Sequence, residues 1–409
     1  MSVGTHHRSR SPLLPLAGIS RLTRLVSHLI ACSLLADMAL RLIANLRFLR
    51  STRCLPSLPA IHSPRVSVLI PARNEAGSIT ACVTSLLSQE YPNIEVLALD
   101  DASTDGTGHL LDTLKRQFPQ LRVIHSAEEP PAGWNGKSYA CHRLAQHATG
   151  SWLLFTDADT IHSPVSIERG ITQAMALHVR LLSAMPYQRA ETWSERLMVS
   201  FIMDFLPLTT VNLVAMWRGR SARLLANGQY MLAHAQTYHA LGGHGSIARA
   251  LVDDFALARL FRRGGHIVAL VDGSSMLECR MYHSFSEVWR GFSKNLLSAL
   301  ASSLTSTGGG ALANLIQAPL FAWGYACVFV LPFARLRRRE QRTLAGIEVC
   351  GLLLLRGIVA VQLKRPPDEI VTTPLSAWMV MAIGLRALYT CWRGRPILWK
   401  QRHYSNTAV

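Results

Sequence analysis

Residues 66–75 read Val-Ser-Val-Leu-Ile-Pro-Ala-Arg-Asn-Glu, a short aliphatic run that ends at a proline and a polar turn. β-Branched residues favour a strand, and Pro71 closes it. Four apolar residues then recur at i, i+4, i+7 and i+8, which is one face of a helix: Ile79, Val83, Leu86 and Leu87. The stretch therefore predicts a buried strand followed by an amphipathic helix, with Ser78 as a candidate N-cap.

The same alternation continues along the chain. Apolar strand patterns recur at 94–99, 121–124 and 152–155, separated by helical patterns around 110–114 and 139–147. Alternating strands and helices are typical of an α/β fold with a mostly parallel sheet covered on both faces. Such sheets bind ligands beyond the carboxyl ends of their strands.

Polar and acidic side chains follow three of these strands where each one ends. They are Arg73 and Glu75, Asp100 and Asp101, and Asp157 and Asp159. A single Asp after a strand is commonly a turn residue or a helix cap. Three such clusters at the binding edge of one sheet predict a ligand site there.

Three blocks at these positions carry a resemblance to a known family. Pro71–Glu75, Asp100–Thr107 and Asp157-Ala158-Asp159 resemble the signature blocks of family 2 glycosyltransferases with the GT-A fold, over roughly residues 64–300. The Gly133–Lys137 block, followed by Ala140-Cys141, is similar to a membrane-bound subgroup that includes carotenoid- and hopanoid-associated glycosyltransferases. The resemblance implies transfer of a sugar from a nucleotide-diphospho-sugar, with a UDP-sugar favoured.

Asp157-x-Asp159 is the motif on which the expected chemistry depends. A divalent cation neutralises the diphosphate of a sugar nucleotide and stabilises the departing nucleoside diphosphate. Carboxylate oxygens suit hard cations such as Mg²⁺ or Mn²⁺. The family pattern implies that Asp159 is the direct metal ligand and that Asp157 contacts the nucleotide.

The resemblance also implies a nucleoside pocket. Its residues are Pro71, Arg73, Glu75, Asp100 and Asp101. One of the two adjacent aspartates, Asp100 or Asp101, has a structural role as an alternative. Lys137 and the backbone N–H groups of its Gly-rich block suit phosphate binding. The block is not a P-loop, because the Gly-x4-Gly-Lys-Ser/Thr spacing is absent.

Val252–Leu257 resembles the acidic block that supplies the catalytic base in inverting members. The alignment makes Asp254 the base and Asp253 its neighbour, and two adjacent carboxylates raise the pKa of one of them. The other interpretation is a helix N-terminus that favours acidic residues. Asn227–Tyr230 and Gly242–His244 match segments on the acceptor side in relatives, although physically they are Gly-rich polar turns.

Composition and charge point to a membrane. Hydrophobic residues make up 49% and charged residues only 16%, against about 25% in a typical soluble domain. Of the net charge of +17, +7 resides in residues 1–53 and +9 in residues 334–409, so it favours anionic lipid headgroups over nucleic acid. Apolar runs at 25–46, 311–333, 343–363 and 370–391 predict three or four membrane segments.

The predicted organisation has four parts. Residues 1–53 form a basic segment with a membrane helix, 64–300 the transferase domain, 311–391 the membrane helices and 392–409 a basic tail. The transferase domain is expected in the cytoplasm at the cell membrane, acting on a lipid-like acceptor. The apolar stretch 197–217 is expected as a kinked helix on the membrane surface, and the eight cysteines lack a CxxC pair, which fits a reducing compartment.

Three other functions stay open. Processive polysaccharide synthases carry a Gln-x-x-Arg-Trp block, whereas residues 287–292 read Glu-Val-Trp-Arg-Gly-Phe, which favours a single transfer. A metal-dependent nucleotidyltransferase would release diphosphate instead of a nucleoside diphosphate. A catalytically inactive membrane homologue would show no cation-dependent binding of a sugar nucleotide.

Overall fold

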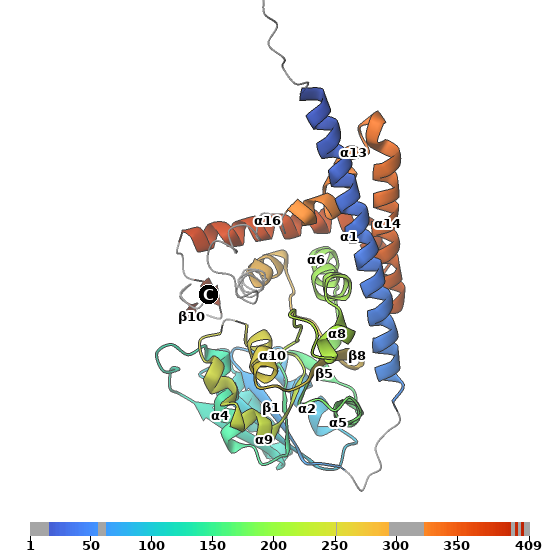
Figure 1. Cartoon of the computed structure of the whole chain (residues 1–409). Coiled ribbons are helices and arrows are strands. Elements are labelled where there is room, and N and C mark those ends of the chain that lie inside the picture. The colour runs from blue at the N-terminus through green and yellow to red at the C-terminus, as the bar shows by residue number, and fades with distance from the viewer. Residues whose placement is uncertain are drawn as a thin grey trace, which may run out of the picture.

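The computed structural model describes residues 16–55, 63–250, 252–293, 323–393, 397–399 and 402–404. A mixed α/β domain lies at one end, and two long helices rise from it side by side (Figure 1). A third long helix lies crosswise between the domain and the far ends of that pair. The α/β architecture of the domain confirms the fold class predicted from the sequence.

The central sheet has eight strands in the order β3-β2-β1-β4-β7-β6-β8-β5. The strands are β1 (Val66–Ala72), β2 (Ile94–Asp101), β3 (Leu121–Ser126), β4 (Trp152–Phe155), β5 (Thr160–His162), β6 (Leu181–Gln188), β7 (Met231–His234) and β8 (Val268–Cys279). The first four strands pair in parallel, with Val66 opposite both Ile94 and Trp152. Their carboxyl ends therefore meet at one edge, as the alternating pattern predicts.

The sheet is mostly parallel, as expected, and its antiparallel pairings all lie in the other half. β7 runs antiparallel to β4 and β6, and β5 runs antiparallel to β8, whereas β6 and β8 are parallel. A small separate hairpin joins β9 (Ile397–Trp399) and β10 (Arg402–Tyr404).

Helices cover both faces of the sheet. They are α2 (Ile79–Leu87), α3 (Thr107–Gln117), α4 (Gly136–His147), α5 (Ser166–Ala176), α9 (Ala235–Ala240), the 3-10 helix η3 (Gly243–Ile247) and α10 (Asp253–Arg263). Alternate strand residues point to opposite faces. Val68 therefore packs with α2 and α5, whereas Leu69 packs with α4 and α10. The second face carries the candidate site.

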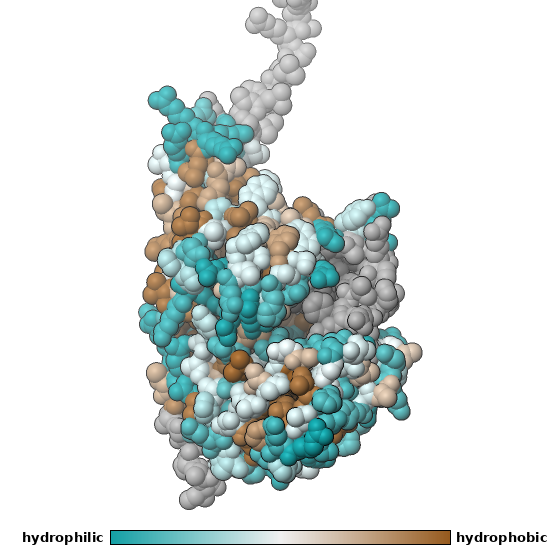
Figure 2. Space-filling view, turned by 180° about the vertical axis from the view of Figure 1, so that it is seen from behind, coloured by the Kyte–Doolittle hydropathy of each residue, from teal (hydrophilic) through white to brown (hydrophobic). Residues whose placement is uncertain are grey.

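Two helices among the described residues are long and apolar enough to cross a membrane, by length and composition. They are α1 (Leu16–Arg53), which contains the predicted 25–46 segment, and α14 (Arg342–Gln362), which matches 343–363. Exposed apolar side chains gather along this pair (Figure 2). They include Leu29 and Leu40 on α1 and Leu354 and Val361 on α14.

The remaining predicted apolar runs do not form further helices that meet the length and composition of a membrane span among the described residues. Run 370–391 forms the end of α15 (Asp368–Val371) and most of α16 (Thr373–Trp392), the crosswise helix. Residues 311–322 lie outside the described part, and α13 (Leu331–Arg335) and the 3-10 helix η4 (Arg339–Gln341) lead into α14. The described residues thus supply two candidate spans where three or four were predicted.

The expectation of a surface-lying helix at 197–217 is wrong. The stretch is kinked, as predicted, because it divides into α6 (Trp193–Ser200), a π-helical turn η2 (Phe201–Phe205), α7 (Leu206–Thr210) and α8 (Leu213–Trp217). However, Phe201, Phe205 and Leu213 are fully buried. Buried Asn45 of α1 donates to the carbonyls of Leu208 and Val211 and accepts from the N–H of Leu213. The segment therefore joins α1 to the sheet.

Candidate functional site

A small cavity opens beyond the carboxyl ends of β1 and β4, between the first turns of α4 and α10. It is lined by Pro71, Lys137, Cys141, Phe155, Thr156, Asp157, Gly228, Met231, His244, Asp253, Asp254 and Leu257. Five residues predicted from the sequence as site residues meet here: Pro71, Lys137, Asp157, Asp253 and Asp254. They come from positions up to 183 residues apart, so the fold brings the separate motifs into one site.

Lys137 links the acids from two parts of the chain. Its Nζ lies 2.6 Å from Asp157 Oδ1 and 3.6 Å from Asp253 Oδ2. Asn135 caps α4 by accepting from the Lys137 backbone N–H, which fixes the start of this helix. Burial alone would lower the pKa of Lys137, but the charges of Asp157 and Asp253 outweigh that effect and hold its pKa well above the usual range.

Asp254 is held in a defined orientation at the start of α10. Its Oδ2 accepts the backbone N–H of Gly228 at 2.9 Å, and its Oδ1 accepts that of Phe255 at 2.7 Å. Burial raises the pKa of Asp254 to about 7, and repulsion from Asp253 adds to the increase. A carboxylate with a pKa near neutrality suits a general base.

Asp159 takes a different direction from Asp157. It is half-buried and does not line the cavity, and it hydrogen-bonds the Cys279 thiol at the end of β8. The two carboxylates at the end of β4 still provide the oxygen donors that a hard divalent cation prefers. By donor type the two carboxylates therefore fit such a cation, and the Lys137 ammonium is already paired with Asp157.

The remaining predicted residues lie along the ends of β1 and β2. Arg73 donates to the Asp101 carbonyl at 2.7 Å and lies 4.0 Å from its carboxylate. Glu75 donates its backbone N–H to Thr107 Oγ1 at the start of α3. Asp100 accepts from the Ser103 N–H and lies 3.4 Å from His125 Nδ1. Asp100 thus has local structural contacts, whereas Asp101 lies with Arg73.

The individual roles of two residues in the site could not be predicted from the sequence. Gly228 was predicted only as part of an acceptor-side segment, with no role of its own, yet its N–H orients Asp254, and a Cβ there would lie 3.1 Å from Lys137 Nζ. Cys141 was noted only as a neighbour of the Gly133–Lys137 block, yet its thiol lines the cavity. Both contacts join residues distant in the chain, so no local spacing signals them.

Comparison with known proteins agrees with this architecture. Residues 67–222 match the family model "Glycosyl transferase family 2". The 4,4'-diaponeurosporenoate glycosyltransferase of Staphylococcus aureus (strain MRSA252) is 27% identical over 266 residues, which cover 64% of this chain and 66% of that protein. The chain therefore matches slightly less than two thirds of the relative's length.

Among solved structures, the mannosyltransferase PcManGT from Pyrobaculum calidifontis, in complex with GDP-Man and Mn²⁺, has a similar fold. The TM-score is 0.53 with 18% identity, covering 88% of this chain and 99% of that one. Family model, relative and fold agree: residues 67–222 are similar to family 2 glycosyltransferases, and the α/β domain has the GT-A fold. The sequence motifs and these comparisons point to the same family.

Proposed function

We propose that the protein is an inverting, metal-dependent glycosyltransferase that moves one sugar from a nucleotide-diphospho-sugar, a UDP-sugar in the favoured case, to a lipid-like acceptor. One observation carries the proposal: Asp157 of the strand-end motif and Asp254 line the same cavity. A donor held by the first carboxylate would thus present its sugar close to the second.

The roles follow from the chemistry of each side chain. A Mg²⁺ or Mn²⁺ ion held by Asp159 and Asp157 would supply charge neutralisation for the diphosphate. Lys137 adds a second cation, 2.6 Å from Asp157 Oδ1. Pro71, Arg73, Glu75, Asp100 and Asp101 form the nucleoside side at the ends of β1 and β2.

Asp254 acts on the acceptor. It takes the proton of an acceptor hydroxyl as that oxygen forms a bond to the anomeric carbon. The bond between this carbon and the diphosphate oxygen breaks, and the nucleoside diphosphate leaves with the electron pair. Attack opposite to the leaving group inverts the anomeric configuration. Asp253 supports the base by keeping its pKa high.

The acceptor class is supported by the apolar helices. Leu40 on α1 is 69% exposed and Val361 on α14 is 80% exposed, so both helices present apolar surface. A bilayer covers such a surface, and the basic flanks of the chain favour anionic headgroups. We therefore place the protein in the cell membrane with its catalytic domain in the cytoplasm. The carotenoid-linked name of the relative agrees with an apolar acceptor.

The proposal is tested by incubating membranes that contain the protein with a panel of sugar nucleotides labelled in the sugar. We expect label in the lipid extract and one nucleoside diphosphate released per sugar transferred. Long polysaccharide chains would instead identify a processive synthase. Release of inorganic diphosphate would identify a nucleotidyltransferase, and no reaction with any donor would contradict transferase activity.

A further inference from the structure

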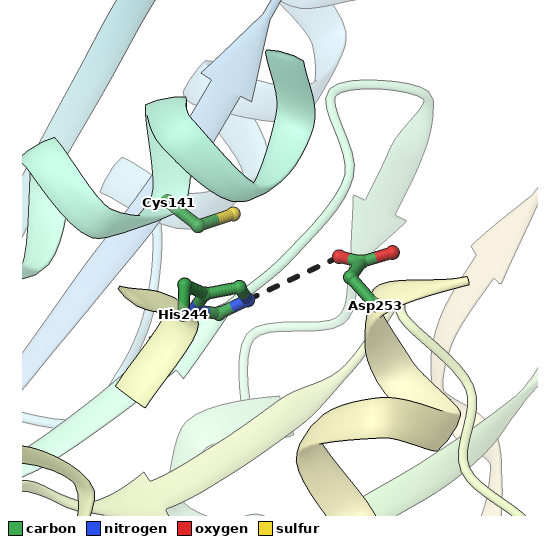
Figure 3. A group of neighbouring side chains, drawn as sticks. All are labelled: Cys141, His244 and Asp253. Atoms are coloured by element: carbon green, nitrogen blue, oxygen red, sulfur yellow. Dashed lines mark ion pairs between the residues drawn. The ribbon is translucent and has the colours of Figure 1, made fainter. Parts of the chain in front are cut away.

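Three side chains of different chemical type converge on one side of the cavity (Figure 3). Cys141 comes from α4, His244 from η3 and Asp253 from the first residue of α10. The thiol sulfur, an imidazole nitrogen and a carboxylate oxygen all lie within 4.8 Å of one another. Cys141 and His244 are buried, whereas Asp253 is half-buried. The glycosyl transfer described above uses neither the thiol nor the imidazole.

The imidazole is fixed so that one nitrogen faces the other two groups. Tyr238 Oη lies 2.8 Å from His244 Nδ1 and also accepts the His244 backbone N–H. His244 Nε2 lies 4.0 Å from Asp253 Oδ2. A hydroxyl oxygen has two lone pairs, so Tyr238 can accept from both donors and leave the Nε2 lone pair free. Such an outer partner orients the histidine in most protein metal sites.

The ligand atoms of Cys141, His244 and Asp253 distinguish this cluster from the carboxylate pair at the end of β4. Sulfur, nitrogen and oxygen together suit borderline ions such as Zn²⁺, whereas Mg²⁺ and Mn²⁺ prefer oxygen alone. Bond lengths of about 2.0–2.3 Å in a tetrahedral site place ligand atoms roughly 3.5 Å apart. The ligand atoms of the trio lie within 4.8 Å of one another, so they need to approach by at most about 1.3 Å to reach that geometry.

Positive charge already lies beside this carboxylate. Lys137 Nζ is 3.6 Å from Asp253 Oδ2 but only 2.6 Å from Asp157 Oδ1. A metal ion that binds Asp253 would therefore displace the longer contact and leave Lys137 with Asp157. Burial lowers the pKa of His244 to about 4, so its ring is neutral and able to coordinate near pH 7. Burial raises the pKa of the Cys141 thiol well above its ordinary range, so coordination releases a proton.

We propose that Cys141, His244 and Asp253 bind one borderline divalent transition-metal ion, such as Zn²⁺, with the fourth coordination position open to the cavity beside Asp254. Three protein ligands and one open position are the arrangement that keeps a zinc ion accessible to a small molecule. The site is separate from the carboxylate pair that ends β4. It does not depend on the donor or acceptor of the proposed transfer.

Cobalt(II) is the probe, because a Co²⁺–thiolate bond gives a charge-transfer absorption that oxygen ligands do not. The full-length protein in detergent is first treated with a chelator and then titrated with Co²⁺. We expect a charge-transfer band that saturates at one Co²⁺ per chain and disappears when Zn²⁺ is added. Cys141→Ser should abolish the band. Tyr238→Phe should keep it but weaken Co²⁺ binding by about tenfold or more, because the outer partner of His244 is lost.

The matched control is Cys279→Ser, which removes a buried thiol that hydrogen-bonds Asp159. This variant and Asp159→Asn should both retain the band. A band that is absent from the wild type, that persists in Cys141→Ser, or that disappears in Cys279→Ser would overturn the proposal. If Cys141→Ser does not fold, Cys141→Ala and His244→Gln with wild-type circular dichroism decide in the same way. Because absorption is the readout, failure here leaves the glycosyl transfer proposal unaffected.

Discussion

The ammonium of Lys137 lies 2.6 Å from Asp157 Oδ1, so the lysine after the Gly-rich block is paired with the strand-end acid motif. The same ammonium lies 3.6 Å from Asp253 Oδ2. One cation thus connects the donor side of the cavity with the acids of the acceptor side. This contact joins two motifs whose separate functions were predicted from the sequence.

Replacing Lys137 should impair the transfer step itself. Lys137→Met removes a positive charge that faces the donor diphosphate in the proposed complex, and loss of such a preorganised group typically lowers kcat by about 10²-fold. Initial rates with a labelled sugar nucleotide measure the effect. Lys115→Met, at an exposed position on α3, is the control and should match the wild type. A Lys137→Met enzyme with wild-type rates would exclude this role.

The activity should depend on pH through Asp254. Its pKa is raised to about 7, so the base is protonated below that pH and transfer is slow. We expect kcat/KM to rise with pH and to level off above about 7 in protein freed of transition metals by a chelator and assayed with Mg²⁺ as the only divalent cation. Asp253→Asn removes the repelling charge and should move this rise to lower pH. A pH profile that does not shift in Asp253→Asn would show that the neighbouring carboxylate does not tune the base.

The same pKa predicts a pH-dependent stability. A carboxyl group whose pKa is raised on folding favours the folded state below its unfolded value, near 4, and this contribution is lost as the pH rises through about 7. Asp254→Asn carries no such charge. Its Tm should therefore exceed that of the wild type at pH 8 by more than it does at pH 5. Equal differences at the two pH values would contradict a raised pKa.

A buried ion pair joins α14 to α15, and both of its side chains contact the end of α6. Arg356 and Glu369 are both about 1% exposed, lie 3.2 Å apart and also contact Ser200. Removing one partner of a buried pair leaves an uncompensated charge and costs about 3–5 kcal/mol. We expect Glu369→Ala to lower the free energy of unfolding by about that amount. Asp368→Ala, at the exposed neighbouring position, should change it by less than about 0.5 kcal/mol.

The parallel half of the sheet was readable because its strands follow one another along the chain. Each strand carries an apolar run that ends in a polar turn, as at Pro71 and Asp157. The other half was not readable, because β7 pairs with β4 across about 80 residues and no local pattern marks its direction. The antiparallel strands therefore had to come from the structure.

The candidate site likewise has features that the sequence predicted and features that only the structure revealed. Asp254 was predicted from its acidic block, but its orienting contact with Gly228 depends on a turn 26 residues earlier in the chain. The apolar stretch around Phe201 suggested a lipid surface, since hydropathy does not distinguish lipid from protein interior. Contacts with α1 and α16 bury it instead. Both the orientation of Asp254 and the burial of the Phe201 segment thus depend on long-range packing, which composition does not predict.

The most direct test of the central claim compares Asp254→Asn with Asp112→Asn, an exposed carboxylate on α3, in membranes given a labelled sugar nucleotide. Lipid-extracted label is measured over time, and donor binding is measured separately. We predict that Asp254→Asn binds the donor normally but transfers sugar at least about 10²-fold more slowly, whereas Asp112→Asn keeps the wild-type rate. Near-wild-type transfer by Asp254→Asn would contradict the account.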